Sequence, residues 1–315
     1  MLHAEYVIIG GGVSGVGALK ALRERSVSSV VLLEARNRLG YTLSWMSSVP
    51  HSAMGQEYNG ADGVFTDLTG AEFAETDLVP MVQDDAVRLK TRVFSVNLAD
   101  RVVHTINETR EYEGIEFSHL LVAPGAVQVL YGRHLLPGRR SNRLFTTYQA
   151  GEMMANYPFL PGRKPIVYGS SPYTVETVYA AVAVGIEPTV VVPGVMSGEL
   201  RTRLPGVPIF ENAVITSVQG DRTFSGIDVD RRGDREKISG DALIIDGDFV
   251  LERQWRERLG VVWDLDGGFT RIPHDHPFRD VFTVIGDAAQ PDPVFLRQFE
   301  RAQNIVRELQ YKKKV

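Results

Sequence analysis

The sequence predicts an α/β fold made of two domains with parallel sheets. Two stretches carry this prediction, because each combines a short buried strand, a glycine-containing turn, a helix and a second strand. The first stretch starts at residues 6–9 and the second at residues 165–168. Such βαβ units require a parallel sheet. Two openings about one domain length apart therefore indicate two domains of the same class.

The remaining elements follow in chain order. Apolar runs rich in β-branched residues predict buried strands, alternating runs predict a hairpin, and small and apolar residues at helical spacing predict helices. Residues 41–85 contain few periodic runs and are assigned to loops with one helix at most. The predicted strands are 6–9, 30–33, 91–96, 101–106, 120–123, 165–168, 189–192, 213–218, 226–230, 242–245 and 282–285; the first helix ends at Leu22, and two others cover 172–184 and 294–309.

The composition excludes several classes of function. The 315 residues include no cysteine, which removes cysteine nucleophiles, iron–sulfur clusters and thiol–disulfide exchange through the protein's own thiols. A net charge of −5 gives no basic field for nucleic acid. No run approaches the roughly 20 apolar residues of a membrane span, and the N-terminus does not read as a signal peptide. We therefore expect a cytoplasmic protein with no nucleic-acid partner and no membrane span.

The first glycine motif, Gly10-x-Gly12-x-x-Gly15, lies between a predicted strand and a predicted helix. In a Rossmann-like dinucleotide-binding domain the first glycine makes the turn, the second admits a pyrophosphate, and the third allows helix and strand to pack closely. Glu34 ends the next strand and would accept hydrogen bonds from an adenosine ribose. The alternative is a glycine turn that serves packing alone. The motif does not by itself distinguish FAD from NAD.

Two further signatures favour FAD. Leu121-Val122-Ala123-Pro124-Gly125 resembles the Ala-Thr-Gly strand end, and residues 282–287 resemble the Phe-Ala-x-Gly-Asp motif, of flavoproteins with two dinucleotide-binding domains. With both βαβ units in order, the chain resembles the thioredoxin-reductase-like branch of the pyridine nucleotide-disulfide oxidoreductase family. The resemblance implies two Rossmann-like three-layer dinucleotide-binding domains, one inserted in the other. The FAD-binding domain is discontinuous, 1–125 with 244–315, and the second, NAD(P)-like nucleotide-binding domain lies between its parts at 126–243.

The resemblance also implies which residues hold a non-covalent FAD. Asp287 would accept a hydrogen bond from a ribityl hydroxyl, unless it is only a helix cap or turn residue. Val93 would offer its backbone amide to adenine, unless it is an ordinary strand valine. The implied FAD-binding set is Gly10, Gly12, Val13, Ser14, Gly15, Glu34, Ala35, Arg36, Gly40, Thr42, Val93, Ala123, Pro124, Gly125, Gly286 and Asp287.

The second glycine motif departs from the family pattern. Ser171 stands where the family has the glycine at which backbone meets phosphate. The residues after the next strand, Val192-Pro193-Gly194, include no acid for an NAD ribose and no basic cluster for an NADP phosphate. Three alternatives are open for this second site: it binds NAD(P)H, it binds another nucleotide, or it binds no nucleotide. The candidate residues of this second site are Gly169, Ser170, Ser171, Tyr173, Thr174 and Glu176, with Glu176 either a nicotinamide-site acid or a first-turn helix glutamate.

A weaker resemblance concerns residues 135–138, 145–150 and 160–163, which resemble FAD subunits of dye-linked amino-acid dehydrogenase complexes. It implies a partner subunit, with a homo-oligomer as the alternative. His274 and His276 have no third ligand at a recognisable spacing, so no metal site is predicted.

The absence of a Cys-x-x-Cys motif excludes relay of electrons through a protein disulfide. The leading hypothesis is therefore an FAD-dependent oxidoreductase that acts as the flavin subunit of a multi-subunit dehydrogenase, with a small amino or hydroxy acid as electron source. The alternatives are an NAD(P)H-dependent flavin reductase and a non-catalytic nucleotide-binding scaffold subunit. No catalytic acid or base is identifiable.

Overall fold

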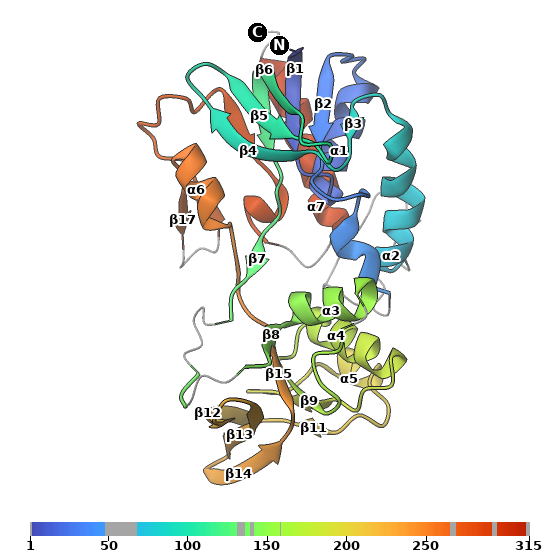
Figure 1. Ribbon diagram of the computed structural model, residues 1–315, viewed down its shortest axis with the longest axis vertical. Coiled ribbons are helices and arrows are strands. Elements are labelled where there is room, and N and C mark those ends of the chain that lie inside the picture. Colours follow the sequence, from blue (N-terminus) through green and yellow to red (C-terminus); the bar gives the residue numbers. More distant parts are fainter. Residues whose placement is uncertain are drawn as a thin grey trace. The chain divides into compact units, whose positions relative to one another are not determined.

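The computed structural model describes residues 2–47, 68–130, 136–138, 142–157, 159–264, 269–291 and 295–312 (Figure 1). The chain divides into two compact units. The first unit comprises Met1–Leu43, Glu57–Val127 and Phe249–Val315, and the second comprises Ser44–Gln56 and Gln128–Asp248. Each unit contains a sheet with parallel strands and helices, so the predicted α/β class is confirmed.

The sheet of the first unit has the strand order β3-β2-β1-β6-β5-β4, and β19 pairs with β6. Ile9 at the end of β1 lies opposite Leu33 on one side and Val122 on the other, in parallel register. The carboxyl ends of β1, β2 and β6 therefore meet at one edge of the sheet. The strands are β1 (Leu2–Ile9), β2 (Val30–Leu33), β3 (Val87–Arg88), β4 (Arg92–Asn97), β5 (Val102–Ile106), β6 (Tyr112–Val122) and β19 (Phe282–Val284).

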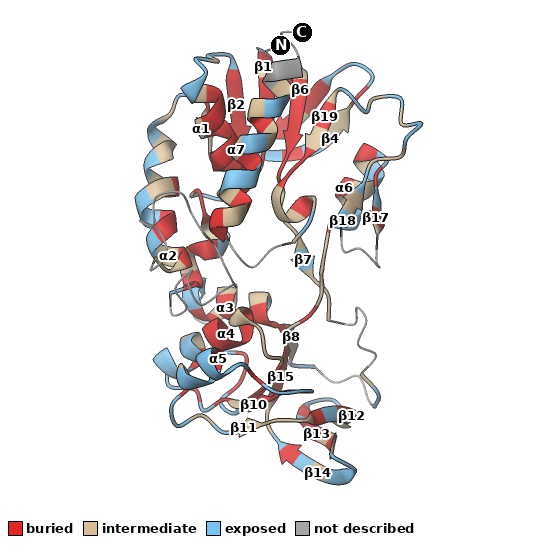
Figure 2. Cartoon of the chain, turned by 180° about the vertical axis from the view of Figure 1, so that it is seen from behind, coloured by how far each residue is buried: buried red, intermediate tan, exposed pale blue. Residues whose placement is uncertain are grey.

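Burial explains why these runs form strands. All four residues of β2 and the last four of β6 are buried, as expected for inner strands of a sheet that is covered on both faces (Figure 2). The sheet is mixed, since β4, β5 and β6 pair antiparallel. The core of this unit also takes side chains from α6 (Arg253–Leu259) and β17 (Val262–Asp264), which is paired with β18 (Phe269–Arg271).

Two long helices of the first unit pack together. They are α1 (Val13–Glu24) and α7 (Phe295–Lys312). A Cβ at Gly17 would lie only 2.8 Å from the carbonyl oxygen of Phe299, so the small residue lets the two backbones approach. Along α7, Ala302 and Val306 are fully buried and Arg301 is exposed, which is the pattern of an amphipathic helix.

The second unit contains a five-stranded parallel sheet of order β11-β10-β9-β15-β8 and a three-stranded antiparallel sheet, β12-β13-β14. Ile245 at the end of β15 lies opposite Tyr168 of β9 and Thr146 of β8. The elements are β8 (Leu144–Thr146), α3 (Thr147–Asn156), β9 (Pro165–Tyr168), α4 (Pro172–Ala183), β10 (Thr189–Val191), α5 (Gly198–Thr202), β11 (Ile209–Phe210), β12 (Ala213–Gly220), β13 (Phe224–Arg231), β14 (Asp234–Ser239) and β15 (Ala242–Ile245). Two short strands, β7 (Val127–Gln128) and β16 (Phe249–Val250), pair where the chain passes from one unit to the other.

The structure contains several elements that the sequence did not predict, among them α5, α6, β8 and β14. Residues 70–83 form successive helical turns, α2 (Gly70–Phe73), a π-helical turn (Ala74–Leu78) and a 3-10 turn (Val79–Gln83), where loops with one helix at most were expected. Strand β6 starts eight residues earlier than the predicted strand. Helix α3 was missed, although Thr146 and Gln149 form a capping box at its start. Among the described residues, no helix has both the length and the apolar character of a membrane span.

Candidate functional site

The first and third glycines of the first motif are required by close backbone packing. Gly10 has a φ of +105°, and a Cβ there would collide with the carbonyl oxygen of Ala123 at the end of β6. A Cβ at Gly15 would collide with the carbonyl oxygen of Gly10. Both atoms are backbone carbonyl oxygens, so the collisions could not be relieved by rotation of a side chain. The start of α1 therefore lies directly against the ends of β1 and β6.

Gly12, the second glycine, has a different environment. It is the N-cap of α1, and within the described part of the chain no side chain caps this helix end. No heavy atom of a described residue lies within 4 Å of the point where a Cβ of Gly12 would be. Backbone N–H groups at the start of a helix lack intrahelical acceptors and carry partial positive charge. This open helix start, followed by Val13 and Ser14, is suited to bind an anion such as a pyrophosphate.

Glu34 lies beside this turn. Its carboxylate accepts hydrogen bonds from the backbone N–H groups of Gly11 and Arg36, each at 2.6 Å. The half-buried side chain is thereby fixed in orientation, while each carboxylate oxygen keeps a lone pair for another donor. Arg36 in turn lies over the ring of Tyr41, with 4.4 Å between guanidinium carbon and ring centre. The arrangement can accept hydrogen bonds from the two hydroxyls of a ribose.

The Gly286-Asp287 pair comes from the far end of the sequence to the same place. Gly286 has a φ of +67°, and a Cβ there would collide with the side chain of Ser14 in the first turn of α1. The Asp287 carboxylate accepts a hydrogen bond from the side-chain amide of Gln298, a residue of α7 that is 4% exposed. Gln298 therefore holds Asp287 in position. The structure thus brings together the glycine motif, the end of β6 and the Gly-Asp pair.

The other predicted residues of this site range from buried to exposed. The backbone N–H of Gly40 donates to the carbonyl of Gly11 at 2.9 Å, which returns the chain to the glycine turn. Thr42 is exposed in the next short helix, and Gly125 has a φ of +77° with open space around it among the described atoms. The side chain of Val93 lies in the core, so only its backbone is available to a ligand. Ala35 is exposed and Pro124 is half-buried.

The second glycine turn begins in the same way. Gly169 has a φ of +153° and follows the buried strand β9. A Cβ at Gly169 would collide with the side chain of Asp246. Ser171 is the N-cap of α4, and its hydroxyl accepts a hydrogen bond from the backbone N–H of Tyr173 at 3.1 Å. The start of this helix is therefore capped by a side chain of the protein.

Asp246, which sequence reasoning missed, lies at this helix start. One carboxylate oxygen accepts hydrogen bonds from the Ser171 backbone N–H at 3.2 Å and the Thr174 hydroxyl at 2.9 Å. The other oxygen accepts from the Gln128 side-chain amide at 3.3 Å. Burial raises the pKa of the Asp246 carboxyl above its ordinary value, and the hydrogen bonds from Ser171 and Thr174 oppose that rise. The signal in the sequence was an acid directly after the buried strand β15.

The remaining candidates of the second site are mostly inside the protein. The ring of the buried Tyr173 packs against Tyr148, with 5.4 Å between ring centres. Glu176 is 1% exposed and lies beyond the first turn of α4, which contains no acidic residue. Ser170 is half-buried. Val192 follows β10 as Glu34 follows β2, and it is buried and apolar.

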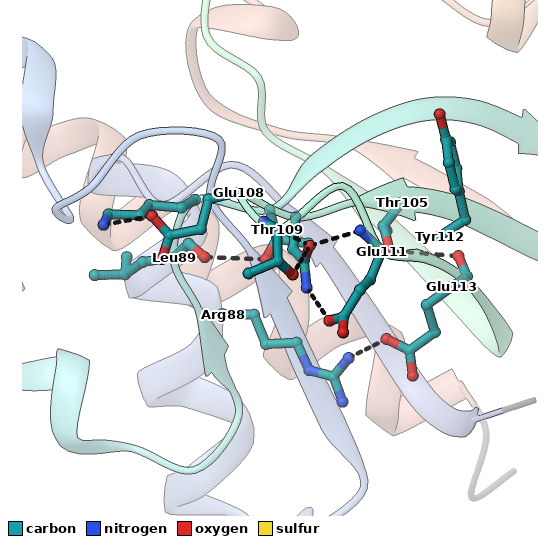
Figure 3. Close-up of a pocket in the computed structure, with 11 residues that line it drawn as sticks. Arg88, Leu89, Thr105, Glu108, Thr109, Glu111, Tyr112 and Glu113 are labelled. Carbon is teal, nitrogen blue, oxygen red and sulfur yellow. Dashed lines mark hydrogen bonds and ion pairs between the residues drawn. The ribbon is translucent and has the colours of Figure 1, made fainter.

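A cavity of about 670 Å³ lies elsewhere in the first unit, between the turns around β3, β5 and β6 (Figure 3). Its lining is polar and internally paired: Arg88 bonds Glu113, and Lys90 bonds Glu108 at 2.7 Å. Hydrogen bonds from neighbouring side chains, chiefly that of Asn107, lower the pKa of Glu111. None of the predicted site residues lines this cavity, and we assign no function to it.

His274 and His276 lie in a loop between Pro273 and Pro277, and both make hydrogen bonds to nearby residues of the chain. A backbone N–H, that of Phe278, donates to His276 at 3.3 Å, and the Arg279 guanidinium bonds the His274 ring at 3.2 Å. Within the described ranges, no group of three or more His, Asp or Glu side chains is arranged to hold a metal ion.

The fold and these motifs define a protein with two dinucleotide-binding-type units. The family model of pyridine nucleotide-disulphide oxidoreductases matches residues 4–304, so the chain belongs to this family of FAD-type oxidoreductases. The predicted family is thereby confirmed. The chain nevertheless has no cysteine, which separates it from members that use a disulfide of their own. No curated protein matches the chain in sequence.

Solved structures share the fold at low sequence identity. L-proline dehydrogenase from P. horikoshii superposes with a TM-score of 0.69 at 18% identity, over 99% of this chain and 56% of that chain. The chain thus corresponds to little more than half of that protein. Thioredoxin reductase from T. acidophilum gives a TM-score of 0.68 at 15% identity over the whole of both chains. A bacillithiol disulfide reductase from Bacillus cereus gives 0.68 at 14% identity, over 98% of this chain and 99% of that chain.

Proposed function

We propose that the chain is a non-covalent FAD-dependent oxidoreductase that works without a redox disulfide of its own. The observation that carries this proposal is the convergence of three separate motifs in the first unit. Gly10 packs on Ala123, and Gly286 packs on Ser14, so residues from both ends of the sequence border one open helix start. A glycine turn that served packing alone would not need a third motif at that helix start.

The residues present fit FAD. The uncapped start of α1 at Gly12 leaves room for a pyrophosphate, and its N–H groups would hold the charge. Glu34 would accept hydrogen bonds from the adenosine ribose, and Asp287 would accept one from the ribityl chain. Pro124, Gly125, Gly40 and Thr42 are the proposed neighbours of the rest of the cofactor.

The cofactor, when bound, supplies the electron-transfer chemistry of its ring system. The chain's own part is to bind and orient it. The hydrogen bond from Gln298 would hold the Asp287 carboxylate in the orientation that accepts from the ribityl chain. The backbone N–H groups of Gly11 and Arg36 would likewise hold the Glu34 carboxylate in the orientation that accepts from the ribose. With no thiol in the sequence, the protein cannot store the electrons in a disulfide.

We further propose that the chain is the flavin subunit of a multi-subunit dehydrogenase whose electrons come from a small amino or hydroxy acid. The likeness to a chain of an L-proline dehydrogenase supports this role. So does the second glycine turn, where Asp246 and Ser171 already use donors that a nucleotide would need. A partner subunit, or a second copy of the chain, and a cytoplasmic location belong to the same proposal.

The second candidate is an NAD(P)H-dependent flavin reductase. It is supported by the likeness over full length to thioredoxin reductase and to bacillithiol disulfide reductase. The two candidates differ in electron donor, because only the reductase requires a nicotinamide nucleotide in the second unit.

The test is the visible spectrum of the purified protein, followed without oxygen after adding NADH, NADPH and then L-proline. Heat release of the chromophore identifies it as FAD and shows that it is not covalently bound. A protein that neither contains nor binds FAD contradicts the proposal. Bleaching of the flavin band by NADH or NADPH supports the reductase, whereas bleaching by the amino acid only in the presence of a co-purified partner supports the dehydrogenase subunit.

A further inference from the structure

We propose that Asp246 excludes dinucleotides from the second unit, because its carboxylate occupies the position at the start of α4 where a pyrophosphate would bind. This inference deepens the proposed function and rests on it in one respect, namely that the flavin receives its electrons from a source other than a nucleotide in the second unit. It assigns that exclusion to one side chain.

The donors of the second turn are already in use. In a βαβ nucleotide site, the backbone N–H groups of the turn and the helix start bind the phosphates. Here the Ser171 N–H and the Thr174 hydroxyl donate to one oxygen of Asp246, and the Tyr173 N–H donates to the Ser171 hydroxyl. A pyrophosphate would have to displace the carboxylate before it could use these groups.

The carboxylate also opposes an anion by charge and by volume. Two negative charges at contact distance in a partly buried site repel each other far more strongly than in water. The Asp246 side chain fills the space beside Gly169, since a Cβ on that glycine would collide with it. At the N-cap of the first unit, Gly12, which corresponds to Ser171, has open space on its side-chain side among the described atoms.

Asp246 is held in place from the other side. The Gln128 amide nitrogen donates to its second oxygen, and the Gln128 amide oxygen accepts from the Thr147 hydroxyl at 2.8 Å and from the Tyr148 N–H at 3.0 Å. These bonds fix which way the amide points. The start of α3 and the start of α4 are thus joined through one glutamine and one aspartate, and Asp246 does not swing away without breaking three hydrogen bonds.

The experiment compares the wild type with Asp246→Ala and Asp246→Asn, each saturated with FAD. Calorimetric titration with NADH, NADPH and ADP measures binding directly. The alanine variant frees the Ser171 and Thr174 donors and removes the charge, so we expect it to bind at least one of these ligands about tenfold or more tightly than the wild type. The asparagine variant removes the charge but keeps an acceptor for those donors, so we expect a smaller gain.

Asp234→Ala is the matched control, because it removes one exposed carboxylate from β14 of the same unit and leaves the turn intact. It should bind as the wild type does. Tight binding by the wild type itself, or the same weak binding by the wild type and both Asp246 variants, overturns the inference. If the alanine variant does not fold, the asparagine variant still tests the inference, because its amide oxygen can keep the hydrogen bonds from Ser171 and Thr174. Failure of the proposed function would appear separately, as a protein that takes up no FAD.

Discussion

The start of α1 and the start of α4 both follow a buried strand whose two neighbours run parallel to it, and both turns begin at a glycine with positive φ. At α1 the N-cap is Gly12, which contributes no side chain, and the acid of the site, Glu34, bonds the Gly11 and Arg36 amides beside the helix start. At α4 the N-cap is Ser171, and Asp246 bonds the N-cap amide itself. The two βαβ units therefore differ at the helix start, which among the described residues has no side-chain cap in the first unit and is capped by Ser171 and Asp246 in the second.

From this difference we infer that a βαβ unit provides an anion site only while its helix start lacks an internal acceptor. Backbone N–H groups are satisfied by a ligand or by the protein, since unpaired donors are costly in a folded interior. Where a buried carboxylate satisfies them, the fold is kept and the ligand is not needed. The predictions below test each half of this comparison.

The largest effect is expected for Gly15→Ala. The new Cβ would collide with the carbonyl oxygen of Gly10, so α1 would have to move away from the end of β1. We expect the free energy of unfolding to fall by about 3 kcal/mol and FAD binding to be lost. Urea unfolding measures the first and FAD titration the second. Gly198→Ala, at the start of α5 with open space around it among described atoms, is the control and should change stability by less than about 0.5 kcal/mol.

The next effect is expected for Gly12→Ser, which would give α1 the kind of cap that α4 has. The φ of −79° and ψ of −170° at Gly12 suit a serine N-cap, so the apoprotein should be as stable as the wild type or slightly more stable. The hydroxyl would take the N–H groups offered to the pyrophosphate, and we expect FAD affinity to fall about tenfold or more. FAD titration of the apoprotein checks this. Unchanged affinity would show that the open helix start is not the phosphate site.

The geometry of the first glycine turn could be predicted from the sequence because its motif is local. Gly10, Gly12 and Gly15 are spaced by the turn they make, and their roles follow from that spacing. The contact of Gly286 with Ser14 is not local, and it entered only through the family resemblance. The side-chain amide that holds Asp287 comes from α7 and has no signature in sequence.

The role of Asp246 at the second glycine turn could not be predicted, because its contact with Ser171 is not local either. Asp246 reaches Ser171 only because β15 lies next to β9, and strand order is not contained in either segment. An acid after an apolar strand fits equally a turn, a cap or a ribose acceptor. The helical turns over residues 70–83 could be predicted only as one helix at most within 41–85, because they mix three helix types and lack one sustained period.

A smaller effect is expected for Ser171→Ala. Loss of the hydroxyl leaves the Tyr173 N–H without its cap, which should lower the free energy of unfolding by about 1 kcal/mol. Nucleotide binding should stay weak, because Asp246 still occupies the helix start. Ser170→Ala, at the preceding residue, serves as the control in the same urea series. If Ser171→Ala bound NADH or ADP tightly, exclusion would belong to Ser171 and not to Asp246.

The smallest effect concerns the pH dependence of stability, where the two units should differ in sign. Burial raises the pKa of Asp246 above 3.8, so the folded protein holds this proton more tightly than the unfolded chain does. The stability of the wild type relative to Asp246→Asn should therefore fall as pH rises from about 3.8 through the folded pKa. In the first unit, a hydrogen bond from Arg23 lowers the pKa of Asp84, so the stability of the wild type relative to Asp84→Asn should fall as pH decreases below about 3.8. Urea unfolding of the three proteins across this range measures both slopes, and equal signs would show that burial does not control the pKa of the Asp246 carboxyl.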